Sequence, residues 1–330
     1  MIKSGKDIIF ASKLIKEGKL VAFPTETVYG LGANGMDAKA VAQIFEVKQR
    51  PSFDPLILHI SSLEMLKDVY KKDYPSLIDE LAAKYWPGPF SIVFNKNKKV
   101  PDIVTAGLET VAVRMPDHPT ALKLIKRSDT PIAAPSANLF GRLSPTEAKH
   151  VKRNLSGVDY LLEGGATTVG LESTIVSVVS GKIEILRPGA ITPEQIKKDF
   201  PNIEVNTSST EKHIQAPGQL KSHYSPKKPF YLIDELSEDV DETSALILFK
   251  PIDLPDNFKG KSFLLSESGD LKEGAAKMFS IFHNLQEDDE VQKIFALSVP
   301  LEGVGVAIMD RLRKASYRFT HLTDEQEIDL

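Results

Sequence analysis

Three arginines stand where a strand or a helix is expected to end, beside segments rich in hydroxyl groups. Arg50 ends a helix just before Pro51, Arg114 lies on the strand TVAVRMP, and Arg187 ends EILRPG. Guanidinium groups bind phosphate and carboxylate oxygens through paired hydrogen bonds. A single arginine at a strand end is more often a solvated rim residue or part of a structural ion pair. Three of them near serines and threonines predict a pocket for phosphates or a carboxylate.

The segment FPTETVYGLG, residues 23–32, gathers hydroxyls, a carboxylate and a phenol on the turn that leaves an apolar strand. Open α/β sheets bind ligands at such strand ends. The alternative is a capping loop, in which the threonines and Glu26 satisfy nearby backbone groups. The segment by itself leaves both interpretations open.

Residues 30–35, GLGANG, match the GxGxxG pattern of dinucleotide-binding units. In such units the first glycine directly follows the strand, and an acid ends the next strand to bind the ribose. Here PTETVY separates the strand from the first glycine, and His59 lies near the end of the next strand. We therefore expect glycines that let a loop turn, and not a nicotinamide site. Lys261 is not part of a P-loop either, because Pro255 stands where the first glycine belongs.

The chain contains no cysteine, which excludes disulfides, thiolate zinc sites, iron–sulfur clusters and a cysteine nucleophile. Its 7 histidines show no HxH or HxxxH spacing, so a metal site built by the protein is not expected. Magnesium brought in by a nucleotide stays open. His59 alternates with Leu58 and Ile60 and faces away from them, and a lone strand histidine is more often a core residue than a base or a ligand.

The charge is unevenly distributed along the 330 residues. There are 41 basic and 45 acidic side chains, a net charge of −4, which argues against a general polyanion-binding surface. Residues 1–205 hold 27 basic and 23 acidic side chains, net +4, and residues 206–330 hold 14 and 22, net −8. An anionic ligand is therefore expected in the first part. No stretch resembles a signal peptide or approaches the roughly 20 apolar residues of a membrane span, so a cytoplasmic protein is expected.

Residues 1–205 alternate between strand-like and helix-like segments, which predicts an open, twisted mixed sheet with helices packed on it. Asp37 is expected to cap one helix, and another is expected to end at Trp86-Pro87. Short β-branched or aromatic runs bounded by turn residues predict strands at Leu20–Pro24, Leu56–Ile60, Ser91–Phe94, Thr110–Met115, Pro131–Ala134, Tyr160–Leu162, Thr174–Val179 and Ile183–Leu186.

A change of composition divides the chain, and its length predicts about two domains. Residues 206–228, rich in Ser, Thr, Pro and Gly, are expected to form a linker over the site. Residues 229–330 are expected to form a small C-terminal α/β domain of the Rossmann-like type. Its strands are FYLI, ALILF, SFLL and IFALSV, with helices near 270–286 and 302–315.

Eight motifs occur in an order that resembles the YrdC-type threonylcarbamoyl-AMP synthases. They are FPTETVYGLGAN, KQRP, PLILHI, WPGP, TVAVRMP, IAAPSAN, LESTIV and LRPG. The linker PGQLKSHYSP and the tail resemble the long, two-domain form of this family. The resemblance implies an open α/β sheet with a concave, positively lined site.

The family resemblance implies synthesis of L-threonylcarbamoyladenylate from L-threonine, bicarbonate and ATP, with release of pyrophosphate. The product serves the threonylcarbamoyl modification of adenosine 37 in tRNA by a downstream transferase complex. Mg²⁺ is expected to accompany ATP, and no organic cofactor and no covalent protein nucleophile is required. The family pattern also implies a group of residues around threonine, which we call the threonine set. It consists of Thr27, His59, Arg114, Ser173 and the backbone near Ala134.

The same pattern implies a second group of residues around the nucleotide, which we call the nucleotide set. It consists of Lys48, Arg50, Thr110, Ser136, Asn138, Ser144 and Arg187. Two positions depart from the family. Asp54 stands where asparagine is common, and its carboxylate would repel phosphate unless magnesium intervenes. Lys221 stands where tyrosine is common, so Lys221 or the neighbouring His223-Tyr224 is expected to close over the ligand. His59 either orients the substrate or acts as base.

Two other classes of function compete with this one. An RNA-binding module without catalysis is disfavoured by the small positive charge of residues 1–205, whose longest basic cluster is Lys96, Lys98 and Lys99. Carbamoyl transfer, as in hydrogenase-maturation proteins with a similar domain, is disfavoured because those proteins carry zinc-finger cysteines. The sequence assigns no role to the C-terminal domain and no oligomeric state.

Overall fold

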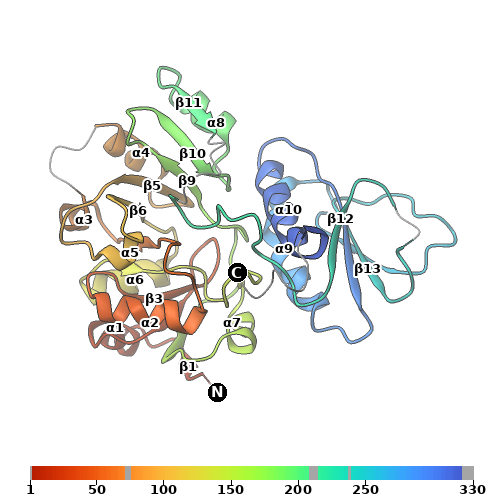
Figure 1. The fold of residues 1–330 in the computed structure, drawn as a ribbon, viewed down its shortest axis with the longest axis horizontal. Coiled ribbons are helices and arrows are strands. Elements are labelled where there is room, and N and C mark those ends of the chain that lie inside the picture. Colours follow the sequence, from red (N-terminus) through yellow and green to blue (C-terminus); the bar gives the residue numbers. More distant parts are fainter. Residues whose placement is uncertain (1, 71–75, 208–214, 237–238, 322–330) are drawn as a thin grey trace. The chain divides into compact units, whose positions relative to one another are not determined.

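The computed structural model describes residues 2–70, 76–207, 215–236 and 239–321 (Figure 1). The chain divides into two compact units. The first unit comprises residues 1–140 and 144–219, and the second unit comprises residues 141–143 and 220–330. The helices of the described residues include none that is long and apolar enough to cross a membrane.

An 11-stranded sheet forms the frame of the first unit, in the order β1-β8-β2-β3-β7-β4-β6-β5-β9-β10-β11. Neighbours are parallel at some places, such as β4 with β6, and antiparallel at others, such as β5 with β6, so the predicted mixed sheet is confirmed. The strands are β1 Ser4–Gly5, β2 Val21–Phe23, β3 Gly30–Asn34, β4 Ile57–His59, β5 Phe90–Asn95, β6 Thr110–Arg114, β7 Ile132–Ala133, β8 Tyr160–Leu162, β9 Thr174–Ser177, β10 Ile183–Arg187 and β11 Val205–Thr207.

Two helices of the first unit have an end where the sequence marks one, but the helix that Arg50 was expected to end stops at Lys48 and leaves Arg50 in the following loop. The Asp37 side chain caps α2 by accepting from the backbone N–H of Lys39, and α4 ends directly before Trp86-Pro87, as predicted. The helices are α1 Ile8–Lys16, α2 Ala38–Lys48, the 3-10 turn η1 Leu63–Met65, α3 Leu66–Val69, α4 Leu77–Tyr85, α5 Asp102–Thr105, α6 Pro119–Ser128, α7 Ala148–Asn154 and α8 Pro193–Asp199.

The two faces of this sheet are covered differently. On one face a continuous core joins the strands to helices including α2, α4, α7 and α8. On the other face α1 and α6 pack against β2, β7 and β8. Beyond them, on β4, β6, β5, β9 and β10, that second face carries a small apolar cluster to which none of the described helices contributes; its members are Ile57, Val93, Ala112, Ile175, Leu186 and Ala216. A site can therefore open over this half of the sheet.

The glycine-rich segment at residues 30–35 corrects one sequence-based expectation. It was expected to be a turning loop, but Gly30–Asn34 is strand β3, paired with β2 and β7. A Cβ atom on Gly32 would lie 2.7 Å from the Phe23 ring and 2.9 Å from Ile132. These glycines therefore allow close packing of the sheet, and their pattern is unrelated to dinucleotide binding.

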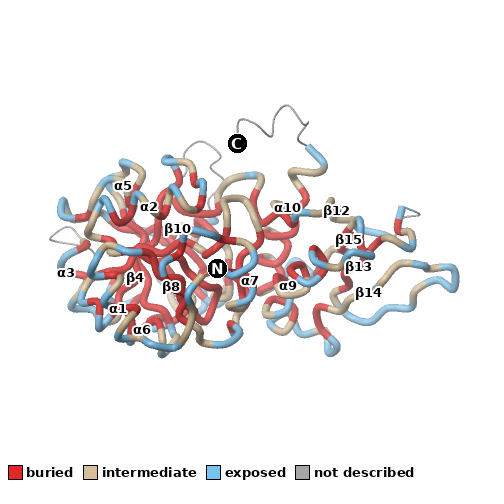
Figure 2. The backbone as a smooth tube through the Cα atoms, turned by 90° about the horizontal axis from the view of Figure 1, so that it is seen from below, coloured by how far each residue is buried: buried red, intermediate tan, exposed pale blue. Residues whose placement is uncertain are grey.

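The second unit is a four-stranded parallel sheet in the order β12-β15-β13-β14, with helices α9 and α10. Buried residues concentrate on its central strands, whereas β14 is partly exposed (Figure 2). The predicted strands and helices of this part are present. Their bounds are β12 Phe230–Ile233, β13 Ser244–Leu248, β14 Lys261–Leu264, α9 Leu271–Leu285, β15 Lys293–Leu297 and α10 Gly305–His321.

Candidate active site

One row of paired residues crosses five neighbouring strands on the sparsely covered face of the first unit. His59 on β4 pairs with Arg114 on β6, and Arg114 pairs with Ser91 on β5. The row continues to Ile175 on β9 and Arg187 on β10. Paired residues of neighbouring strands point to the same face, and strands lie about 4.8 Å apart, so the row spans about 19 Å.

A β-bulge brings Arg187 into this row. Two residues of β10, Leu186 and Arg187, stand opposite the single residue Ile175 of β9. Strict alternation from Ile185, which belongs to the core on the helix-covered face, would send Arg187 to that same face. The bulge shifts the alternation by one residue, so Arg187 pairs with Ile175 on the open half of the sheet.

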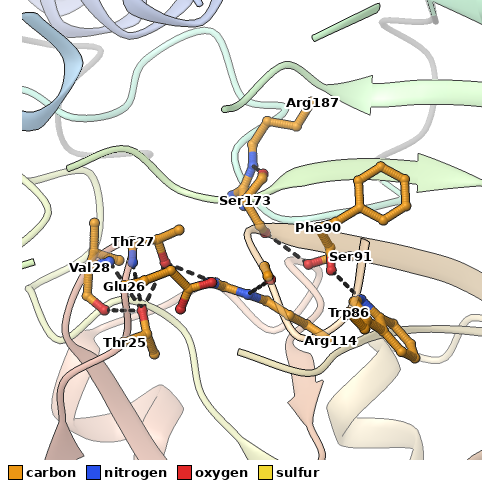
Figure 3. Close-up of polar contacts among 11 residues, drawn as sticks. Thr25, Glu26, Thr27, Val28, Trp86, Phe90, Ser91, Arg114, Ser173 and Arg187 are labelled. Carbon is orange, nitrogen blue, oxygen red and sulfur yellow. Dashed lines mark hydrogen bonds and ion pairs between the residues drawn. The ribbon is translucent and has the colours of Figure 1, made fainter. Parts of the chain in front are cut away.

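Arg114 is one of the two cations of the row and is buried. Its Nε donates to the Gly88 carbonyl at 3.1 Å, and one terminal nitrogen donates to the Thr27 hydroxyl at 2.8 Å. The other terminal nitrogen forms an ion pair with Glu26 (Figure 3). Two residues before Arg114 on the same strand, Ala112 pairs with Ile57 and lies in the apolar cluster on the same face.

The loop before β3 combines both interpretations that its sequence left open. The Thr25 hydroxyl donates to the Val28 carbonyl at 2.7 Å and accepts from the backbone N–H of Val28, as a capping residue does. Thr27 and Glu26 instead point to Arg114, on a strand far away in the chain (Figure 3). Local capping by Thr25 therefore holds a loop whose other two polar side chains face the row.

A second group of hydrogen bonds joins the row to the start of β9. The Ser91 and Ser173 hydroxyls lie 2.8 Å apart, and Arg187 donates to the Ser173 hydroxyl at 3.2 Å (Figure 3). Arg187 also donates twice to the Ser173 carbonyl and once to the Pro217 carbonyl. Arg187 thus connects Ser173 to the segment around Pro217, whose neighbour Ala216 packs on the apolar cluster below the row.

His59 is buried, and burial together with the nearby Arg114 lowers its pKa to about 3. Its imidazole is therefore neutral at physiological pH. The edge of the ring meets Phe23, with 6.3 Å between the ring centroids, and within the described residues Nδ1 has no hydrogen-bond partner. A neutral ring beside a guanidinium can orient a ligand, but so low a pKa makes it a weak base.

Lys48 ends α2 and extends its ammonium group toward the loop that follows β7. It donates to the Ser136 carbonyl at 2.6 Å and to the Asn138 carbonyl. Burial lowers the pKa of Lys48 well below its ordinary value, and Arg50 lowers it further. An anion placed beside this amine would raise the pKa again, so the ammonium form is favoured by an anionic ligand.

Arg50 and Asp54 form a buried pair in the loop between α2 and β4. Their charged atoms lie 2.9 Å apart, and Arg50 also donates to the carbonyls of Asp54 and Pro55. Burial raises the pKa of Asp54, and the charge of Arg50 opposes that rise. Arg50 therefore offsets the negative charge that would repel phosphate at this position.

Of the remaining predicted site residues, some lie close to the row and others do not. Ser144 is buried and donates to the Glu172 carboxylate, and Ala134 donates its N–H to the Ile57 carbonyl beside the row. Thr110 begins the strand that Arg114 ends, so their Cα atoms lie about 13 Å apart. Lys221 is exposed and belongs to the second unit.

Three contact residues are absent from the sets predicted from the sequence. Glu26 pairs with Arg114, Ser91 binds Ser173, and Glu172 accepts from Ser144. Ser91 begins the predicted strand Ser91–Phe94, so it stands at a strand end like Arg114, which is a signal in the sequence. The partners of Glu26 and Glu172 lie 88 and 28 residues away and could not be read from the chain.

Among the described residues of this region, four buried cations stand against three buried carboxylates, namely Lys48, Arg50, Arg114 and Arg187 against Glu26, Asp54 and Glu172. Buried charges cost stability unless they are paired, and an unequal number of them invites a ligand of the opposite sign. The arrangement thus fits an anionic ligand.

Comparison with known proteins finds two family models and full-length relatives that match this chain. The Sua5, YciO and YrdC family, described as "Telomere recombination", matches residues 13–189, and "Threonylcarbamoyl-AMP synthase, C-terminal domain" matches residues 191–316. The chain is 41% identical to the threonylcarbamoyl-AMP synthase of Pyrococcus abyssi over 323 residues, 94% of each chain. It is 40% identical to that of Bacillus subtilis over 322 residues, 93% of this chain and 92% of the relative.

A solved structure matches over nearly the whole length. It is the crystal structure of Pyrococcus abyssi Sua5 complexed with L-threonine, with a TM-score of 0.85 and 37% identity, covering 97% of this chain and 98% of the other. The fold, both family matches and the near-complete coverage agree. This chain belongs to the family of two-domain threonylcarbamoyl-AMP synthases.

Proposed function

We propose that this protein synthesises L-threonylcarbamoyladenylate from L-threonine, bicarbonate and ATP and releases pyrophosphate. One observation carries the proposal: the buried Arg114 side chain is held in the row by the Thr27 hydroxyl and the Gly88 carbonyl. The chain that holds it is 41% identical to a threonylcarbamoyl-AMP synthase. An enzyme is better supported than an RNA-binding module, because these cations are buried around one half of the sheet and do not form an exposed basic surface.

The threonine set supports a subsite around Arg114. A guanidinium binds a carboxylate through paired hydrogen bonds. Neutral His59 lies beside Arg114 in the row, the Thr27 hydroxyl accepts from Arg114, and Ser173 accepts from Arg187. The backbone at Ala134 follows β7, the antiparallel neighbour of β4. We propose that threonine lies here with its carboxylate on Arg114.

The nucleotide set supports a second subsite beside the first. Lys48, Arg50 and Arg187 are buried cations on α2, the following loop and β10. We propose that they hold the phosphates, with polar contacts from Thr110, Ser136, Asn138, Ser144 and Lys221. Asp54 contributes through its ion pair with Arg50.

The reaction needs positioning and charge stabilisation more than a protein nucleophile. The threonine amine and bicarbonate give a carbamate and water. A carbamate oxygen then bonds to the α-phosphorus of ATP, and the bond to pyrophosphate breaks. Bicarbonate, ATP, the carbamate and pyrophosphate are anions and threonine carries a carboxylate, so fixed cations lower the barrier by holding them together in a low-dielectric site.

Mg²⁺ is expected to reach the site bound to ATP. The described residues include no group of three or more acidic or histidine side chains that could hold a metal, and the Asp54 carboxylate is paired with Arg50. The phosphates themselves would then supply the oxygen ligands that Mg²⁺ prefers, and the ion would neutralise part of their charge.

The linker and the domain limits 1–205, 206–228 and 229–330 stay predictions. Support for a linker that begins over the site comes from Ala216, which packs beside Ile57, and from Pro217, which accepts from Arg187. We propose that the linker closes over the bound ligands. A chain lacking residues 206–330 should then lose ATP affinity; unchanged affinity and turnover would refute the closure.

We also propose that the adenylate passes to a tRNA threonylcarbamoyl-transferase complex, and the cytoplasm remains the location predicted from the sequence. The direct test is to incubate the purified protein with ATP, threonine and bicarbonate and to measure pyrophosphate and the labile adenylate. We expect both products only when all three substrates are present. Matched reactions each omit one substrate, and turnover without threonine would refute the assignment.

A further inference from the structure

Glu26 is a buried acid in contact with Arg114, and it belongs neither to the two predicted sets nor to the reaction scheme above. It is 6% exposed, and one of its carboxylate oxygens binds the terminal nitrogen of Arg114. The other oxygen, Oε2, is buried without a hydrogen-bond partner among the described residues. A buried carboxylate oxygen without a donor is costly, so it indicates a missing donor.

Arg114 has capacity left for a ligand. A guanidinium has five N–H groups, and the described residues account for three contacts, to Gly88, Thr27 and Glu26. The remaining N–H groups can bind one carboxylate. That carboxylate would then lie beside the Glu26 carboxylate on the same guanidinium, and a positive group between the two would relieve their repulsion.

Charge balance decides which ligand such a pair prefers. A lone buried arginine binds any small carboxylate, whereas an arginine paired with an acid is neutral as a unit. A neutral pair with separated charges matches an α-amino acid zwitterion, which offers a carboxylate to Arg114 and an ammonium group, with its three N–H donors, to Glu26.

We propose that Glu26 binds the ammonium group of the amino acid whose carboxylate binds Arg114, so that the pair selects amino acids over other carboxylates. This inference rests on the proposed function for the identity of the amino acid, threonine. Other acids nearby are already paired: Asp54 with Arg50, and Glu172 with Ser144. His59 is neutral and cannot replace the acid as the partner of a cation.

The test compares threonine with 3-hydroxybutanoate, which is threonine without its amino group. Binding of each to the full-length protein is measured by calorimetry, without ATP, for the wild type and for Glu26→Gln. The glutamine keeps an oxygen that can accept from Arg114 but carries no charge. We expect Glu26→Gln to weaken threonine by roughly tenfold or more, with 3-hydroxybutanoate bound as well as before or more tightly.

A matched control removes the acidic partner of another buried cation in the first unit. Asp102 pairs with Lys96 at 2.6 Å, outside the row, so Asp102→Asn should leave both affinities unchanged. If Glu26→Gln weakens both ligands equally, Glu26 only holds Arg114 in place and the inference is wrong. Unchanged threonine affinity in Glu26→Gln would overturn it as well.

Two further outcomes keep the inference separate from the proposed function and from misfolding. If the wild type shows this selectivity but forms no adenylate from ATP, threonine and bicarbonate, the proposed function fails and the ammonium site stands. If Glu26→Gln does not fold, the wild type alone decides: 3-hydroxybutanoate should bind at least about tenfold more weakly than threonine. Equal affinities would overturn the inference.

Discussion

The two units differ in where they keep their charges, although both are α/β structures. Four buried cations of the first unit lie around the row from His59 to Arg187, and a fifth, Lys96, is buried outside the row. The second unit keeps most of its ion pairs at the surface, for example Lys261 with Asp288 and Glu290. Its buried exception, Arg311, pairs with Asp310 and lies over the Tyr224 ring at 5.2 Å.

This difference indicates where the chemistry lies. Burying charges costs stability, and apolar residues of the same size would often stabilise a fold better. The first unit concentrates this cost on the half of the sheet where one face carries an apolar cluster to which none of the described helices contributes. Sites that break the rules of stable packing are where function is expected. The second unit shows no comparable concentration of buried charge in its described residues.

The largest expected effect comes from Arg114→Ala. It removes the guanidinium that we propose binds the threonine carboxylate, and it should raise the threonine KM by about 100-fold. It also leaves Glu26 buried without its cation, which should lower the free energy of unfolding by about 3–5 kcal/mol. Pyrophosphate release and urea denaturation measure the two effects. Adding Glu26→Gln should recover stability but not the KM, and an unchanged KM in Arg114→Ala would remove Arg114 from the threonine subsite.

The stability contributed by neutral His59 should depend on pH. Its folded pKa of about 3 lies below the ordinary 6.5, so the unfolded chain binds the extra proton first. The contribution is complete above pH 6.5 and is lost as the pH falls toward 3. Below pH 6, the stability of the wild type relative to His59→Gln should fall by about 1.4 kcal/mol for each pH unit. Urea denaturation at pH 7, 6 and 5 measures this, and a difference that stays constant would contradict the buried neutral ring.

Glycine substitutions test packing in the two units. Gly32→Ala places a methyl group against Phe23 and Ile132 and should destabilise the first unit by about 2 kcal/mol. Gly274 lies in α9, where a Cβ would meet Leu265 at an ordinary 3.5 Å. Gly274→Ala should therefore stabilise the second unit, by up to about 1 kcal/mol through helix propensity. Thermal unfolding of both variants measures this, and a neutral Gly32→Ala would refute close packing at β3.

The smallest expected effect is at the surface of the second unit. Lys261 contacts Asp288 at 2.9 Å and Glu290 at 2.6 Å, but the side chains are partly or largely exposed. Solvent screens such pairs, so Lys261→Ala should change the free energy of unfolding far less than Arg114→Ala does. Urea denaturation at low and high salt measures it. A loss as large as that of Arg114→Ala would remove the contrast between the two units.

Much of the fold could be predicted because it depends on local patterns. Short β-branched runs and capping residues such as Asp37 indicate strands and helix starts within a few neighbours along the chain. The short edge strands β1 and β11 were not predicted, and β11 reaches into the residues that were expected to begin the linker. Strand β3 was missed for a different reason. Its glycines carry the signature of a turn, and the reason they form a strand, the Phe23 ring packed against Gly32, comes from a neighbouring strand.

The sequence by itself determined the family, the mixed α/β class, the cations at strand ends and the absence of thiol chemistry, because these depend on residue types and their order. Only the tertiary structure decided which charges meet. The bulge at Leu186 turns Arg187 toward the row, and Glu26 reaches Arg114 across 88 residues of chain. Such pairings follow from strand register and burial, which arise only when distant segments pack together.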